Sequence, residues 1–107
     1  MTNPSRTLVV LTTMLLSFGT VCFAGSPGEE VYKAKCQSCH GARGMADTSI
    51  GLAFKIKPIS DAAVRKYSHA EMEECTRNGI GKMQAFKGKL SDEEIRASVA
   101  YFRSLMP

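Results

Sequence analysis

The sequence predicts an all-α domain of three or four helices joined by long loops. Helix-start patterns, in which a serine is followed three residues later by a glutamate, occur at Ser26, Ser68 and Ser91. After the last of these, an apolar stripe at helical spacing runs through Ile95, Val99, Phe102 and Met106. Strand-like alternation is confined to residues 54–57, a stretch so short that we interpret it as part of a loop.

The first helix is expected to begin after Ser26, with Pro27 at its first position and Glu29 placed to complete a capping box. It continues past Tyr32 and delivers Cys36, which opens the pentapeptide at residues 36–40. In this pentapeptide two cysteines stand three positions apart, and a histidine directly follows the second.

This pattern is the attachment signature of a c-type haem. Two thiols at this spacing can add to the vinyl groups on one porphyrin edge, and the next residue then offers a neutral imidazole nitrogen to the iron. The sequence therefore predicts one haem c, covalently attached through Cys36 and Cys39 and ligated by His40.

Two other interpretations of the cysteine pair are open. A thioredoxin-like redox pair needs a βαβ setting, and no Val/Ile-rich strand precedes Cys36. A zinc module needs two further ligands, for which His69 and Cys75 are the candidates. A red purified protein would exclude the zinc module.

The middle of the chain predicts a haem-covering loop and then two helices. Residues 48–58 are expected to form a loop that covers one haem edge, with contacts from Ile50, Leu52, Phe54 and Ile56. The alternative is that these four residues form a small core beneath the loop. Ser60 and Asp61 are expected to cap a short helix that runs through Tyr67, and the helix begun at Ser68 should run to Gly79. Met72 and Cys75 share one face of that helix, so Cys75 is predicted to be a small buried hydrophobe. An exposed Cys75 could instead link two molecules.

A haem ligated by His40 needs a second ligand on its other face, or an open site there. The candidates are Met45, Met72, Met83, Met106 and His69. Met83 lies in a loop flanked by Gly79 and Gly81, whose backbone can approach a flat ring closely. Met45 is too near His40 in the sequence, and the others fall on helical stripes or beside a cap. Met83 is therefore the predicted axial ligand.

Residues 1–24 are typical of an export signal. Arg6 precedes an apolar stretch, and Ala24 offers a small residue before a cleavage point at Gly25. The apolar stretch is shorter than the ~20 residues of a spanning helix. An uncleaved membrane anchor is the main alternative, and lipidation of Cys22 a weaker one. Residues 25–107 then form one small domain with three cysteines, an odd number that does not indicate a disulfide framework.

Three segments together resemble a small monohaem class I cytochrome c of bacteria: residues 36–41, residues 81–86 around Met83, and residues 90–105. The resemblance covers the chain from Glu29 onward. It implies the cytochrome c fold around one covalently bound haem, with the first and last helices crossing at Tyr32 and Tyr101. It also implies coordination by His40 and Met83 and a role in electron transport.

The chain departs from that family at two places. Gln84 follows the predicted axial methionine, where the family commonly has proline. Residues 49–52 stand where the family often has a Gly-Pro pair, whose carbonyl accepts a hydrogen bond from the axial histidine. The sequence therefore leaves open which group orients His40.

The predicted function is that of a periplasmic electron carrier, not an enzyme, which shuttles single electrons between respiratory redox partners. The alternative is a haem enzyme or gas sensor whose sixth site is open or weakly ligated because Gln84 loosens the Met83 loop. The chain carries a net charge of +4, and seven lysines could surround the haem edge and steer an acidic partner or dock on a membrane complex: Lys33, Lys35, Lys55, Lys57, Lys82, Lys87 and Lys89. Nothing in the sequence indicates nucleic-acid binding.

Overall fold

The computed structural model describes residue 19 and residues 25–107, so the predicted leader lies outside the described residues apart from Gly19. Within this part of the chain the structure has helices and two isolated bridges, but no strand. The helices are α1 (Pro27–Lys35), α2 (Gln37–His40), α3 (Ser49–Ala53), α4 (Ala62–Arg65), α5 (His69–Asn78) and α6 (Asp92–Ser104). The all-α prediction is confirmed.

Three of these helices are long and correspond to the predicted start signals. Ser68 and Ser91 each form a complete capping box, with Glu71 and Glu94 respectively. At α1 the prediction is only half right: Ser26 accepts a hydrogen bond from the backbone N–H of Glu29, but the Glu29 carboxylate pairs with Lys33 instead of reaching back. The ion pair with Lys33, one helical turn further on, therefore replaces the capping-box hydrogen bond of the Glu29 carboxylate.

The short helices were predicted less well. Residues 49–53, interpreted as loop, form the single turn α3, which Thr48 caps by accepting a hydrogen bond from the backbone N–H of Gly51. Asp61 caps α4 as expected, but the helix ends at Arg65, before Tyr67. A single helical turn is too short to show apolar periodicity, so the sequence can predict only its capping residue.

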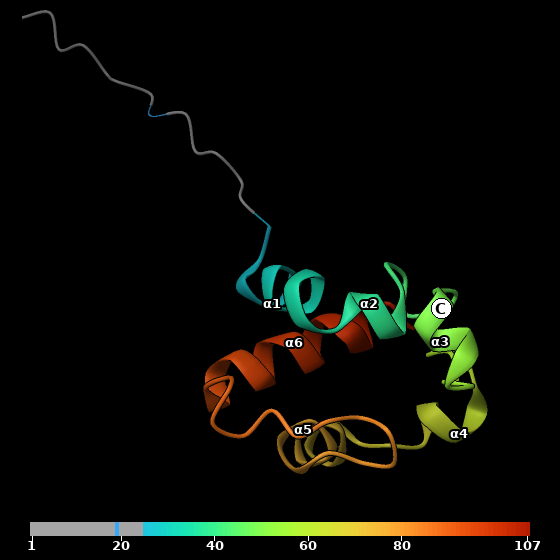
Figure 1. The fold of residues 1–107 in the computed structure, drawn as a ribbon. Coiled ribbons are helices and arrows are strands. Elements are labelled where there is room, and N and C mark those ends of the chain that lie inside the picture. Colours follow the sequence, from blue (N-terminus) through green and yellow to red (C-terminus); the bar gives the residue numbers. More distant parts are fainter. Residues whose placement is uncertain (1–18, 20–24) are drawn as a thin grey trace, which may run out of the picture.

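Helices α1 and α6 cross and pack closely, which confirms the implied crossing of the first and last helices (Figure 1). Gly28 lies against the backbone of Ala97, where a Cβ atom would stand 2.2 Å from the carbonyl oxygen. The rings of Tyr32 and Tyr101 meet at the crossing with centroids 5.2 Å apart. The Tyr32 hydroxyl donates a buried 2.6 Å hydrogen bond to the carbonyl of Gly41, which ties α1 to the loop after α2.

The opposite face of α6 packs on α5 (Figure 1). The core between them contains buried Ile59, Met72, Ile95 and Val99, with Phe102 and Met106 packed against it. The predicted stripe of α6 is thus its buried face.

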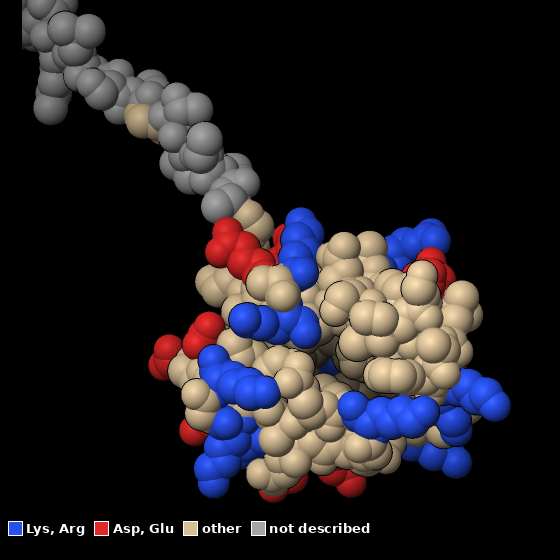
Figure 2. Space-filling view, in the orientation of Figure 1, with Lys and Arg blue, Asp and Glu red and all other residues tan. Residues whose placement is uncertain are grey.

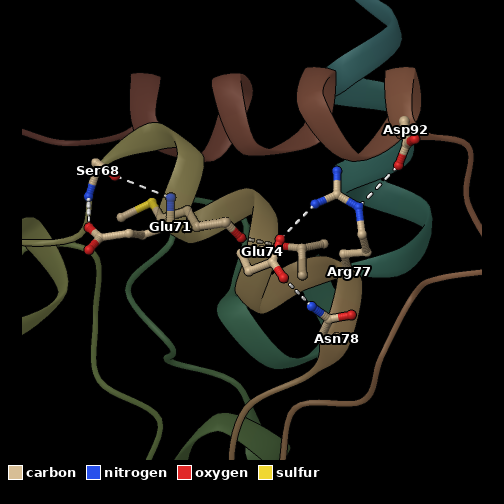
Figure 3. A network of polar contacts seen from close by, with 8 residues as sticks. Ser68, Glu71, Glu74, Arg77, Asn78 and Asp92 are labelled. Atoms are coloured by element: carbon tan, nitrogen blue, oxygen red, sulfur yellow. Dashed lines mark hydrogen bonds and ion pairs between the residues drawn. The ribbon is translucent and has the colours of Figure 1, made fainter.

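At the end of α5, Arg77 bonds both Glu74 and Asp92, and Asp92 is the first residue of α6 (Figure 3). Asn78 also donates to Glu74. These polar contacts fasten the end of one long helix to the start of the other.

Candidate functional site

The two cysteines and the histidine of the pentapeptide are held by one helical turn. The backbone N–H of Cys36 donates to Tyr32 at the end of α1, and the N–H groups of Cys39 and His40 both donate to the Cys36 carbonyl. Residues three and four apart on a helix share a face, so this turn presents the three side chains together. Cys36, Cys39 and Cys75 all carry free thiols.

The side chains of Cys36 and His40 face a cavity of about 190 Å³ between α1, α5 and α6. Cys36 and His40 line it from the N-terminal part of the domain, and Cys75 and Met83 line it from the segment between the start of α5 and α6. Its remaining walls are mostly apolar: Tyr32, Val64, Tyr67, Met72, Thr76, Ile80, Ser98, Val99 and Phe102. A wider hollow of about 650 Å³ shares Cys36, His40 and Met83 with it, and includes Cys39. Figure 2 shows a hollow on one face of the molecule, with basic side chains on several sides of it.

The His40 side chain is largely buried, and burial lowers the pKa of its imidazole. The ring is therefore neutral at pH 7, the form that ligates a metal. Its Nδ1 atom is buried and finds no hydrogen-bond partner in the described part of the chain. The ring instead packs against Phe102, with centroids 5.1 Å apart and planes inclined by 60°.

The environment of Cys36 does not suit a redox-active cysteine pair. Burial, reinforced by the nearby Cys39, raises the pKa of the Cys36 thiol to about 11. Reactive cysteine pairs work through a thiolate that forms because the pKa of its thiol is lowered, whereas the pKa of Cys36 is raised. No three His, Cys, Asp or Glu side chains come together as a metal site among the described residues, which also leaves the zinc interpretation without support.

Met83 lies in a tight turn between α5 and α6. Ile80 and Met83 exchange two backbone hydrogen bonds, of 3.1 and 2.9 Å. Gly79 ends α5 with a φ of 78°, and a Cβ atom there would stand 2.8 Å from the Met83 carbonyl oxygen. Glycine at this position therefore lets the backbone of the turn approach the end of α5 closely. The turn is followed by Gln84, whose side-chain oxygen accepts a hydrogen bond from Lys89.

The other candidate ligands differ from Met83 in their surroundings. Met72 also lines the cavity, but it is buried in the core and its Sδ lies 3.8 Å from Nη1 of Arg103. Met106 packs against the core, Met45 is 41% exposed and lines neither hollow, and the imidazole of His69 pairs with Glu73. Met83 is the cavity methionine that belongs to neither a helix nor the core.

The predicted edge-covering residues are partly right. Ile50, Phe54 and Ile56 line the wider hollow, whereas Leu52 is 70% exposed and lines neither. Leu52 differs because α3 is a helical turn, which points successive side chains in different directions. Cys75 is only half-buried, since it stands in the cavity wall.

Sequence reasoning missed several wall residues, chiefly Val64, Tyr67, Thr76 and the site role of Phe102. Phe102 was assigned to the core stripe alone, and helical spacing cannot show that the same ring touches His40. The position of Tyr67 just beyond a short helix gave no signal.

The site fits the haem that its sequence motif predicts. The free thiols of Cys36 and Cys39, the neutral imidazole of His40 and the thioether of Met83 all line the wider hollow. A flat apolar ring suits this cavity, and His40 on α2 and Met83 in the turn after α5 are lining side chains that could ligate a metal.

Comparisons with known proteins agree with this geometry. The family described as cytochrome C oxidase, cbb3-type, subunit III matches residues 24–102. Cytochrome c6 of Picosynechococcus sp. is 35% identical over 102 residues, which cover 88% of this chain and 85% of that protein. Cytochrome c6 of Leptolyngbya boryana is 34% identical over 74 residues, covering 69% and 84% respectively.

A solved structure is also similar. The KustC0563 c-type cytochrome superposes with a TM-score of 0.68 at 30% identity, covering 75% of this chain and 98% of that one.

Proposed function

Because the chain belongs to the family of small class I cytochromes c, we propose that it is a periplasmic carrier of single electrons whose haem iron is ligated by His40 and Met83. Members of this family hold one covalent haem c through a cysteine pair, which here is Cys36 and Cys39. The observation that carries the ligand assignment is that His40 and Met83 line the same cavity and come from separate elements.

The chemistry of the two side chains supports a carrier. The haem supplies an iron that changes between Fe(II) and Fe(III). A thioether from Met83 favours Fe(II) and raises the reduction potential, and two protein ligands leave no axial position open to a substrate. The apolar walls keep water from the ligands, which also favours the less charged reduced state.

The ligand assignment is tested by the optical spectrum of the oxidised protein. The weak band that sulfur–iron bonding produces at the near-infrared edge should be present, should be lost in Met83→Ala, and should persist in Met72→Leu. Met72→Leu is the matched control because it removes the other methionine that lines the cavity, with little change in volume. An unchanged spectrum of Met83→Ala would remove Met83 from the site.

The alternative of an enzyme or gas sensor depends on a loosely held Met83. Gln84 replaces the proline that would stiffen the turn, although its bond to Lys89 restrains it. Carbon monoxide should bind poorly to the reduced protein at neutral pH if Met83 occupies the sixth position. Ready binding would contradict the carrier and favour the alternative.

We further propose that the partner carries acidic groups around its docking face. Three of the seven lysines, Lys35, Lys57 and Lys82, line the wider hollow. Lys33 pairs with Glu29 and Lys89 with Gln84, so these two are already engaged. Exposed charges that surround a hollow steer an oppositely charged partner, and the steering weakens as salt increases.

The test compares Lys57→Gln with Lys87→Gln in electron transfer to a redox partner. Lys87 is exposed but lines neither hollow, so its removal changes the net charge equally without touching the hollow's rim. Lys57→Gln should slow the reaction at low salt and Lys87→Gln should slow it less. Equal effects, or a rate independent of salt, would reject steering at this rim.

The proposed location depends on the predicted signal at residues 1–24. None of the helices that the structure describes has the length and apolar character needed to span a bilayer. Mass spectrometry of the haem-loaded protein from the periplasmic fraction should give a chain that begins at Gly25 with one haem added. A membrane-bound chain that retains residues 1–24 would favour the uncleaved anchor.

A further inference from the structure

We propose that Phe54, at the end of α3, is a positioning residue for the predicted axial ligand Met83. The Phe54 ring contacts the ammonium group of Lys82, and Lys82 directly precedes Met83 in the turn after α5. All three residues line the wider hollow, so the contact joins two separate segments across it. This inference rests on the proposed ligation by Met83. It names what holds the ligand's turn in a chain where Gln84 follows the methionine.

The first step concerns the tip of the turn that carries Met83. The turn is anchored at its two ends: Gly79 packs closely on it at the end of α5, and the N–H of Phe86 donates to a carbonyl of α5 at 3.0 Å. Between these anchors Ile80 is 49% exposed, and a Cβ atom at Gly81 would meet nothing within 4 Å in the described part of the chain. A contact from another segment is therefore what can hold the tip.

The second step is the contact that reaches this tip. Nζ of Lys82 lies 4.8 Å from the centroid of the Phe54 ring, within the ~6 Å over which the face of an aromatic ring attracts a cation. Phe54 is 47% exposed and Lys82 is exposed as well, so the contact lies at the mouth of the hollow. Lys89, in the same segment, bonds the Gln84 side chain instead. Lys82 is thus the lysine that connects the turn to α3.

The third step concerns what fixes Phe54 itself. The backbone N–H groups of Phe54, Lys55 and Ile56 donate to carbonyls of α3 at 2.9, 3.2 and 2.9 Å, which closes the end of this helix. Lys55 has a φ of 55°, the left-handed conformation that glycine usually adopts after a helix. A non-glycine residue stays in this conformation where the surrounding contacts determine the backbone. The backbone on either side of the Phe54 ring is therefore fixed, so the ring can anchor the turn.

The consequence is a smaller population of the form in which Met83 is detached. Carbon monoxide can take the sixth position only in that form, so its apparent affinity for the reduced protein reports the detached fraction. The energy of an exposed cation–π contact corresponds to about a two- to fivefold change in such a population. Carbon monoxide carries no charge, so the loss of a lysine does not alter its affinity through long-range attraction.

The test measures carbon monoxide affinity of the haem-loaded reduced protein, and hydrogen exchange of the Met83 amide, which donates to Ile80 at 2.9 Å. Phe54→Leu should raise both the affinity and the exchange rate about two- to fivefold. Phe54→Tyr keeps an aromatic face and should change neither. Lys87→Gln removes a charge from the same segment outside both hollows, and should also change neither. A Phe54→Leu protein that behaves like Phe54→Tyr would overturn the proposal.

A double-mutant cycle tests whether the contact itself is the cause. Lys82→Gln should act like Phe54→Leu, and adding Phe54→Leu to Lys82→Gln should have no further effect, because the contact is already lost. Both side chains are exposed, so these variants should fold. Additive effects would overturn the positioning role. Failure of Met83 ligation would be recognised separately, because the unmodified protein would then lack the sulfur–iron band, whereas failure of this inference alone leaves the band in place.

Discussion

The two sides of α6 are built differently. On the α1 side, backbone meets backbone at Gly28 and Ala97, and aromatic rings fill the crossing. On the α5 side, a cavity lies between the helices, and the ion pair of Arg77 with Asp92 joins the end of α5 to the start of α6. The first contact is complete within the polypeptide. The second encloses a space that a haem would fill, so we expect the stability of this half to depend on haem attachment.

Preventing haem attachment should have the largest effect and should separate the two sides. An emptied apolar cavity of 190 Å³, at about 24 cal/mol per Å³, costs about 4–5 kcal/mol. A Cys36→Ala/Cys39→Ala chain should lose this free energy of unfolding in urea titrations. In hydrogen exchange the amides of α5 and residues 79–86 should lose more protection than those of α1 and α6. Equal loss on both sides would show that the halves are not distinct.

Gly28→Ala attacks the side that is complete without the cofactor. The new methyl group would stand 2.2 Å from the Ala97 carbonyl oxygen, so the helices must move apart. We expect a loss of about 3 kcal/mol in the free energy of unfolding, the upper range for overpacking. The exposed Ala34→Ser on the same helix is the control and should change stability by less than ~0.5 kcal/mol. A tolerated Gly28→Ala would mean that the crossing is loose.

Tyr32→Phe removes one polar contact from the same crossing. The hydroxyl donates to the Gly41 carbonyl, which keeps its bond from Gly44 when the hydroxyl is lost. Because no acceptor is left wholly unpaired, the cost should be about 1 kcal/mol in thermal or urea unfolding. The sulfur–iron band should be unaffected, since the ring packing against Tyr101 and Phe102 remains. A cost near zero would show that packing alone fixes this loop.

The same contrast explains what the sequence could predict. Helix caps and apolar stripes are local patterns. The sequence could therefore predict the long helices that start after Ser68 and Ser91, and also the buried face of α6. The haem motif was legible because covalent attachment fixes its spacing. The contact of Phe102 with His40 joins residues far apart in the chain, and no periodicity encodes it. The half-formed cap at Glu29 failed for a local reason, competition from Lys33.

The smallest expected effect is the loss of stability at low pH. It compares the two capping boxes, one at the start of α5 and one at the start of α6. Hydrogen bonds from the backbone and side chain of the capping serine lower the pKa of Glu71, at the start of α5, and of Glu94, at the start of α6. A carboxyl whose pKa is lower folded than unfolded stabilises the fold above its ordinary pKa of about 4.3, and loses this contribution as the pH falls.

Glu71→Gln and Glu94→Gln should therefore each lower stability slightly at pH 7 and make little difference in acid. Urea midpoints measured at pH 7 and about pH 3 check this sign. Both boxes have the same geometry, so the two variants should lose similar global stability. Hydrogen exchange should nevertheless differ, because fraying of α5 opens the cavity wall at Met72 and Cys75, whereas α6 is held from both sides. Identical local exchange in both variants would argue that the cavity side is as firmly built as the crossing.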